Sequence, residues 1–100
     1  MLNVAKQFDG KNAVFSLEGR LDTVTAPDLE KEVRDALPEV EELTMDFEKL
    51  DYISSAGLRV LLSTQKTMAD QGGDLKIVRV KEAIMEVFEI TGFIDILTIE

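Results

Sequence analysis

The stretch Asp51-Tyr52-Ile53-Ser54-Ser55-Ala56-Gly57-Leu58-Arg59-Val60-Leu61-Leu62 is the most informative part of this sequence. Its second half predicts a helix over about residues 56–70, since one face repeats at helical spacing through Leu58, Leu61, Leu62, Gln65 and Ala69. The residues before that helix predict a short loop that delivers two serines to the helix start. Ser54 or Ser55 is therefore expected at the N-cap, where a serine oxygen accepts a free backbone N–H.

A helix start also favours an anion. Several backbone N–H groups lack acceptors there, and the peptide dipoles add about half a positive charge. A serine in the first turn can therefore carry a phosphate, which adds about 1.5 to 2 negative charges, without disrupting the helix. Serines at helix starts are more often caps alone, so these residues by themselves leave both interpretations open.

The chain before this stretch predicts a hairpin, a helix and a strand. Residues 2–8 and 13–18 alternate like strands, and Asp9-Gly10 is a favoured turn between them. A loop over residues 19–24 leads to a helix over 26–37, which Pro38 ends. Thr25 with Asp28 resembles a capping box, and Pro27 suits the first turn. Residues 43–47 predict a half-buried strand, and residues 48–53 connect it to the serines.

The chain after it predicts one more strand and one more helix. Gly72-Gly73 closes the long helix, and a strand follows over residues 75–80. Ala83, Ile84, Val87 and Phe88 form an apolar helical stripe that Thr91-Gly92 stops. Residues 93–99 are left as a final short strand or an extended tail.

This order of elements predicts an α/β fold in a single domain over residues 1–100. We expect a mixed sheet of about four strands, with an N-terminal hairpin and later parallel strands, and about three helices. The half-polar strand at 43–47 indicates that one face of the sheet is less covered than the other.

Composition narrows the chemistry. The chain has 100 residues, enough for one core, and it contains neither cysteine nor histidine. Disulfides, thiolate nucleophiles and Ser-His-Asp triads are therefore excluded, and the commonest metal ligands are absent. No Gly-rich phosphate loop of the G-x-x-x-x-G-K-[ST] kind is present, which disfavours a nucleotide sensor. We expect no enzyme, no cofactor and no metal site.

The net charge of −9 opposes binding to nucleic acid or to an anionic membrane, because both rely on lysine and arginine. A protein partner with a basic patch fits better, although acidity that only maintains solubility is equally consistent. No apolar run approaches the ~20 residues of a membrane span, and no signal pattern opens the chain. A cytoplasmic location is expected.

Several short motifs occur together in a recognisable order. They are Gly19-Arg20-Leu21-Asp22 with Thr25-Ala26, the strand at 43–47, Tyr52-Ile53-Ser54-Ser55-Ala56-Gly57-Leu58, and Gly72-Gly73-Asp74-Leu75. In this order and spacing they resemble the STAS domain of bacterial anti-sigma factor antagonists, over nearly the whole chain.

The resemblance implies a regulatory protein without catalytic activity. Such a domain, when unphosphorylated, binds an anti-sigma factor that is also an ATP-dependent serine kinase, and so frees a sigma factor for transcription, often in a stress response. The kinase phosphorylates one serine and releases the domain, and a PP2C-type phosphatase reverses the modification.

The resemblance also assigns residues. The phosphoacceptor lies two residues before the loop glycine, which here is Ser55. The family often has an aspartate just before that serine, where this sequence has Ser54, and the neighbouring Ser54 hydroxyl is the alternative acceptor. Asp22 matches an acidic position near the phosphoacceptor; the other interpretation is a carboxylate that caps local N–H groups. The partner-binding surface is expected to comprise Asp22, Thr23, Ser54, Ser55, Ala56 and Gly57, whereas Asp46 is expected to be structural.

An alternative function remains open. The second interpretation is a STAS subunit of a larger signalling or lipid-transport complex, in which the serines are only caps. Family members commonly continue into a further helix, and without it we expect exposed apolar surface around Ile96, Leu97 and Ile99. A monomer or a weak dimer is expected.

Overall fold

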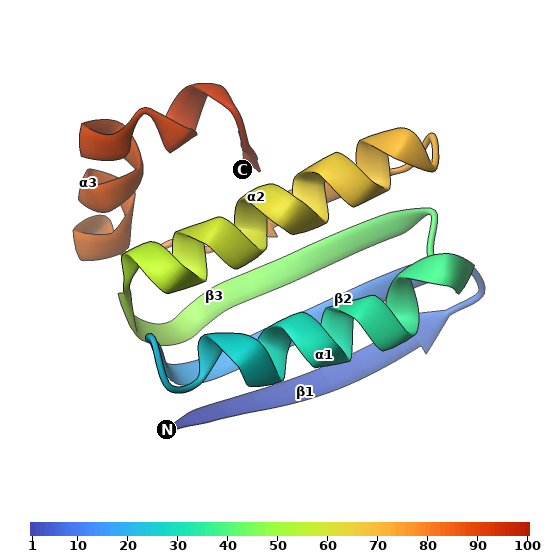
Figure 1. Cartoon of the computed structure of the whole chain (residues 1–100), viewed down its shortest axis with the longest axis horizontal. Helices are drawn as coiled ribbons and strands as arrows, with labels where there is room; N and C mark the ends of the chain where they lie inside the picture. The colour runs from blue at the N-terminus through green and yellow to red at the C-terminus, as the bar shows by residue number, and fades with distance from the viewer.

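The sheet contains five strands, an antiparallel hairpin followed by parallel strands (Figure 1). The computed structural model describes the whole chain, Met1–Glu100. The strands lie side by side in sequence order: β1 (Leu2–Asp9), β2 (Asn12–Leu21), β3 (Glu42–Ile53), β4 (Asp74–Val78) and β5 (Thr98–Ile99). β1 pairs antiparallel with β2, and all other neighbouring pairs are parallel. The expected count of about four strands omits β5, which has only two residues.

Three helices connect these strands, and the predicted α/β class is confirmed. They are α1 (Ala26–Ala36), α2 (Ser55–Asp70) and α3 (Glu82–Thr91), with single 3₁₀ turns at Leu37–Glu39 and Phe93–Asp95. Gly10 (φ 62°) turns the first hairpin and Gly92 (φ 81°) ends α3, both in the left-handed region that glycine adopts most readily. The predicted turn and helix stop are therefore present.

The helices lie on one face of the sheet. Figure 1 shows α1 and α2 in front of the strands, and α3 packs Phe88 against Phe47 of β3 with ring centroids 6.4 Å apart. The strand residues on this face are buried in one 23-residue core; they include Ala13, Phe15, Leu17, Leu43, Met45, Leu75 and Ile77. Their outward neighbours Val14, Ser16, Thr44 and Lys76 are only half-buried. The expectation that one face is less covered is confirmed.

Two predicted elements differ in detail. β3 extends to Ile53, so residues 48–53, expected as a connection, are strand. The buried face of α2 also differs: Leu58 and Leu61 are buried as predicted, but Ala69 is exposed and Leu62 and Gln65 are only half-buried. The other buried residues of the helix are Gly57, Val60, Thr64 and Met68.

The C-terminal segment is better packed than expected. Leu97 is 6% exposed and belongs to the core, and Ile99 packs against that core. Only Ile96, at 47% exposure, matches the predicted apolar surface. The hydrogen bond from the Glu100 N–H to the Ile77 carbonyl, 2.9 Å, holds the chain end beside β4. None of the helices is long and apolar enough to cross a membrane.

Candidate functional site

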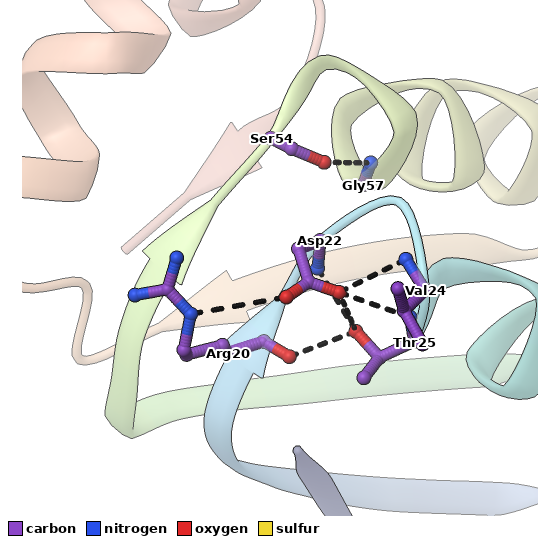
Figure 2. A network of polar contacts seen from close by, with 6 residues as sticks. All are labelled: Arg20, Asp22, Val24, Thr25, Ser54 and Gly57. Atoms are coloured by element: carbon purple, nitrogen blue, oxygen red, sulfur yellow. Dashed lines mark hydrogen bonds and ion pairs between the residues drawn. The ribbon is translucent and has the colours of Figure 1, made fainter.

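Two parallel strand ends bring the predicted site residues together. Leu21, the last residue of β2, pairs with Ile53, the last residue of β3, and the Ser54 N–H donates to the Leu21 carbonyl at 2.9 Å. Because parallel strands end at the same edge of a sheet, the loop after β2 and the start of α2 lie next to each other. Figure 2 shows this arrangement, with Asp22 in the loop and Ser54 at the helix start.

The loop after β2 is held by its own side chains. Asp22 Oδ1 accepts the N–H groups of Val24 and Thr25, each at 3.0 Å, which is the hydrogen-bond pattern of an Asx turn. The Thr25 hydroxyl donates to the Arg20 carbonyl at 2.8 Å and accepts the Asp22 N–H at 2.9 Å. The predicted capping box of Thr25 and Asp28 is wrong, since Thr25 makes no side-chain cap bond to α1. Its hydroxyl is already used within the loop.

These contacts keep Asp22 charged. The Thr25 N–H lowers the pKa of Asp22; burial opposes this, and the Val24 N–H and the positive charge of the N-terminus reinforce it. The carboxylate thus has the local capping role that the sequence left open for it. Its side chain is still 27% exposed, and Oδ2 lies 3.8 Å from Arg20 Nε. Asp22 therefore presents a fixed negative charge at the molecular surface.

Arg20 and Tyr52 are site neighbours that the sequence analysis missed. They pair across β2 and β3, and the Arg20 guanidinium lies 4.2 Å from the centroid of the Tyr52 ring, within cation–π range. Their register follows two shifts in the β2–β3 pairing, between Ser16 and Glu18 and between Gly19 and Arg20. Such irregularities carry no local sequence signal, so the contact was not predictable.

The two serines have different environments. Ser54 is the N-cap of α2, and its Oγ accepts the Gly57 N–H at 3.3 Å (Figure 2). Ser55 is the first residue of the helix, and its exposed side chain makes no hydrogen bond to another protein group. Of the two candidate N-caps, the structure therefore selects Ser54. The Ser55 hydroxyl is accessible from solvent.

Gly57 is required by close packing between α2 and the strands. A Cβ at this position would lie 2.7 Å from Leu21 Cγ and 2.9 Å from Ile53 Cγ1, both shorter than van der Waals contact. Both contacts come from the last residues of the two strands that form the site. The glycine thus lets the helix start approach the strand ends, with Ala56 packed against the core beside it.

A shallow hollow of about 170 Å³ lies between the first turns of α1 and α2. Thr23 and Ala56, two of the predicted partner-binding residues, line it. The other lining residues are Ala26, Pro27, Glu30, Arg59 and Val60. Asp46 lies elsewhere, on the uncovered face of the sheet, where it forms an ion pair with Arg79.

The fold and the position of the serines agree with the family that a comparison of the sequence identifies. The family model for the STAS domain matches residues 3–100, and the chain belongs to this family. Its similarity to named relatives places it among the anti-sigma factor antagonists. It is 38% identical over 84 residues to BtrV of Bordetella bronchiseptica, which is named as such an antagonist; the match covers 83% of this chain and 72% of BtrV. It is 29% identical over 98 residues to the anti-sigma-B factor antagonist of Bacillus subtilis, covering 98% of this chain and 90% of that protein.

Solved structures confirm the fold. A Thermotoga maritima protein named as an anti-sigma factor antagonist superposes with a TM-score of 0.89 at 18% identity, covering 96% of this chain and 84% of that one. The Bacillus cell fate determinant SpoIIAA in its phosphorylated form superposes with a TM-score of 0.78 at 17% identity, covering 98% and 91%. SpoIIAA in its unphosphorylated form gives a TM-score of 0.77 at 16% identity, covering 100% and 87%.

Proposed function

We propose that this protein binds an anti-sigma factor that is also a serine kinase, and that phosphorylation of Ser55 switches this binding off. The unphosphorylated protein sequesters the kinase and so releases a sigma factor. A PP2C-type phosphatase restores the binding form. The observation that most directly supports this proposal is the exposed Ser55 hydroxyl beside the charged Asp22 loop, in a chain related to anti-sigma factor antagonists.

The surface around Ser55 is suited to docking on a protein. Asp22 and Thr25 fix the loop through four hydrogen bonds of 2.8 to 3.0 Å, so little loop entropy is lost on binding. The Ser54 cap and the packing of Gly57 fix the start of α2 in the same way. The kinase would contact Asp22, Thr23 and residues 54–57 together, with the Ser55 hydroxyl directed at the γ-phosphate of its ATP.

The phosphate would then weaken the contact without unfolding the domain. A phosphate at the first helical position faces free N–H groups and the positive end of the helix dipole, so α2 tolerates it. In the complex it places about two further negative charges beside Asp22, in a zone that must lose water. A cost of about 1.4 kcal/mol reduces affinity tenfold, so a loss of two or three contacts is sufficient for a switch.

The proposed chemistry belongs to the partners. The kinase supplies ATP and transfers the phosphoryl group to Ser55, and the phosphatase removes it, so this chain itself has no catalytic activity. Sigma factors act on RNA polymerase in the cytoplasm, and we place this protein there with them. The functional class is therefore transcription regulation by partner switching.

Phosphate mapping tests the proposal. We expect the purified anti-sigma factor kinase of the same organism, given ATP, to place one phosphate on the protein, on the tryptic peptide that spans Ser54 and Ser55. Fragment-ion mass spectrometry would locate it on Ser55. Ser54→Ala should still accept phosphate, whereas Ser55→Ala should not.

Two outcomes would contradict the proposal. Wild-type protein without phosphate at either serine would remove the switch. Ser55→Ala that still accepts phosphate at Ser54 would move the switch to the capping serine. A Ser55→Ala variant that equals wild type in every partner assay would instead favour the scaffold role within a larger complex.

A further inference from the structure

Arg59 differs from the other arginines of this protein. Arg20 pairs with Asp22, Arg34 with Glu30, and Arg79 with both Asp46 and Glu48. Arg59 makes no ion pair and donates no side-chain hydrogen bond, although the chain carries 20 acidic residues against 11 basic ones. Its side chain is exposed. An unpaired guanidinium on so acidic a surface is available to a further anion.

The position of Arg59 relative to Ser55 is fixed by the helix. Both residues belong to α2 and both are exposed, and they are separated by four residues. Side chains at positions i and i+4 lie on the same helical face, with Cβ atoms about 5–6 Å apart. An anion N-terminal to a cation is the favourable order for such a pair. Arg59 also lines the hollow between α1 and α2 that Thr23 and Ala56 share.

We propose that Arg59 is the intramolecular partner of the phosphate on Ser55, and that it neutralises and orients this phosphate in the phosphorylated protein. A guanidinium presents parallel N–H donors that match phosphate oxygens, so the pair forms charge-assisted hydrogen bonds. This inference rests on the proposed phosphorylation of Ser55 and adds the residue that receives the phosphate. Arg59 is a positioning residue in this role, since it takes no part in the transfer itself.

The other arginine and lysine side chains at this end of the molecule already have partners. Arg20 faces Asp22 and Tyr52, and Lys81, at the start of α3, pairs with Asp51 at 2.5 Å. Glu30 of α1, which lines the same hollow, pairs with Arg34 at 3.7 Å. Arg59 alone among these arginine and lysine side chains is free to pair with a phosphate on Ser55, while the positively charged chain terminus acts on Asp22.

The pair would change what the protein presents to its partner. Without phosphate, Arg59 is a free positive charge beside Ser55. With phosphate, the same guanidinium is occupied, and the surface loses a cation as it gains two negative charges. The phosphorylated form is also held in a defined geometry, which favours recognition of the phosphate by a phosphatase.

The experiment uses phosphoserine inserted at position 55 during translation, in wild type and in Arg59→Gln. The second pKa of phosphoserine is ordinarily about 6, and ³¹P NMR follows its titration directly. We expect this pKa to be higher in Arg59→Gln than in wild type by about half a pH unit, a roughly threefold change in proton affinity. Arg59→Lys should recover part of the difference, since it restores the charge but not the parallel donors.

Lys66→Gln is the matched control. Lys66 is another exposed cation of α2 without an ion-pair partner, and it lies about three turns from Ser55, so this variant removes the same charge at a distance. It should leave the phosphoserine pKa within about 0.1 of wild type. Equal shifts in Arg59→Gln and Lys66→Gln, or no shift in either, would overturn the assignment of Arg59.

Unfolding gives a second readout. Arg59→Gln should lower the melting temperature of the phosphoserine-55 protein by about 2–4 °C relative to phosphorylated wild type. The same substitution in the unmodified protein should change it by less than about 1 °C, because Arg59 has no partner to lose. A similar loss in both forms would show a merely structural role for Arg59.

The test separates the two proposals. Phosphoserine is placed by the ribosome, so the titration does not depend on any kinase that modifies Ser55. A kinase that leaves Ser55 unmodified would remove the proposed function and leave the pair of phosphate and Arg59 measurable. A normal kinase reaction together with an unshifted phosphoserine pKa would remove the pair alone.

Discussion

At the scale of single residues, the two adjacent serines have different roles: Ser54 caps α2, and Ser55 is the proposed phosphorylation site. Ser54 Oγ accepts the Gly57 N–H, so its loss leaves a helix-start donor without a protein acceptor. We predict that Ser54→Ala lowers the free energy of unfolding by about 1 kcal/mol. Ser55→Ala should change it by less than about 0.5 kcal/mol, because that side chain is exposed and unbonded. Urea unfolding of both variants measures this; equal losses would contradict the assignment of the cap to Ser54.

Gly57 provides a second test at this scale, in which two physical effects have opposite signs. Helix propensity alone predicts that Gly57→Ala stabilises the protein by up to about 1 kcal/mol. The new Cβ would meet Leu21 Cγ at 2.7 Å, so we predict a net destabilisation of about 1–2 kcal/mol instead. Denaturant unfolding decides the sign.

The clash in Gly57→Ala has an internal control. Leu21→Ala removes the Leu21 atoms that the new Cβ would meet and leaves only the contact with Ile53 Cγ1 at 2.9 Å, so Gly57→Ala should cost less in that background than in wild type. A stabilised Gly57→Ala, or strict additivity of the two substitutions, would show that α2 does not approach the strand ends as closely as the structure indicates.

At the scale of elements, an ion pair on the uncovered face joins β3 to the end of β4. Arg79 is the only non-glycine residue with a positive φ, 55°, and its guanidinium contacts Asp46, with Nε 3.2 Å from Oδ1. The Asp46 side chain is 9% exposed. Burial raises the pKa of Asp46, but the hydrogen bonds from Arg79 and the Glu48 N–H outweigh it, and the net shift is downward.

We predict that Arg79→Ala lowers the free energy of unfolding by about 1–2 kcal/mol at pH 7, because the carboxylate of Asp46 loses its partner. Since the pKa of Asp46 is lowered in the folded protein, the pair's contribution is present above the unfolded pKa of about 3.8. It is lost as the pH falls through the lower folded value. Urea titrations at pH 7 and near pH 3 should therefore show the difference from wild type shrinking in acid.

Lys49→Ala is the control for this pH dependence. Lys49 lies on β3 near Asp46 but makes no ion pair, so its removal should cost less than about 0.5 kcal/mol at either pH. A difference between wild type and Arg79→Ala that is the same at pH 7 and in acid would contradict the assignment of the stabilisation to the ionised Asp46.

Most of the secondary-structure elements could be predicted from the sequence. The hairpin, the three helices and the parallel strands follow from alternation, helical spacing and turn residues, and the motifs located the serines and Asp22. β3 was predicted too short because its alternation fails after Phe47: the next buried residues are Leu50 and Ile53, three apart, beside a strand whose register shifts. Such a shift depends on the neighbouring strand, which local patterns do not describe.

The buried face of α2 was misjudged for a related reason. Thr64 is polar but buried, and its hydroxyl donates to the Val60 carbonyl at 2.7 Å, so its hydrogen bond is satisfied within the helix. A prediction from the spacing of apolar residues passes over Thr64 and instead includes Ala69, which is exposed. The environments of Arg20 and Arg59 could not be predicted from the sequence either, because whether an arginine is paired or free depends on tertiary packing.

At the scale of the whole molecule, the net charge of −9 predicts how the protein meets its partner. If the kinase presents a basic patch, long-range attraction accelerates association, and salt screens this attraction over a Debye length of about 10 Å at 0.1 M. We predict that raising the ionic strength from about 50 mM to about 500 mM lowers the association rate by about tenfold and changes the dissociation rate less. Surface plasmon resonance measures both rates, and an association rate independent of salt would contradict this prediction.

Control of an entire complex by one exposed hydroxyl is the central claim, and a binding titration tests it most directly. Isothermal titration calorimetry should compare the unmodified protein with the forms that carry phosphoserine at position 55 or at position 54, each against the anti-sigma factor kinase. We predict that phosphoserine at position 55 weakens binding by at least about tenfold while circular dichroism shows an unchanged fold. Equal affinities of the unmodified protein and the phosphoserine-55 form would contradict the account.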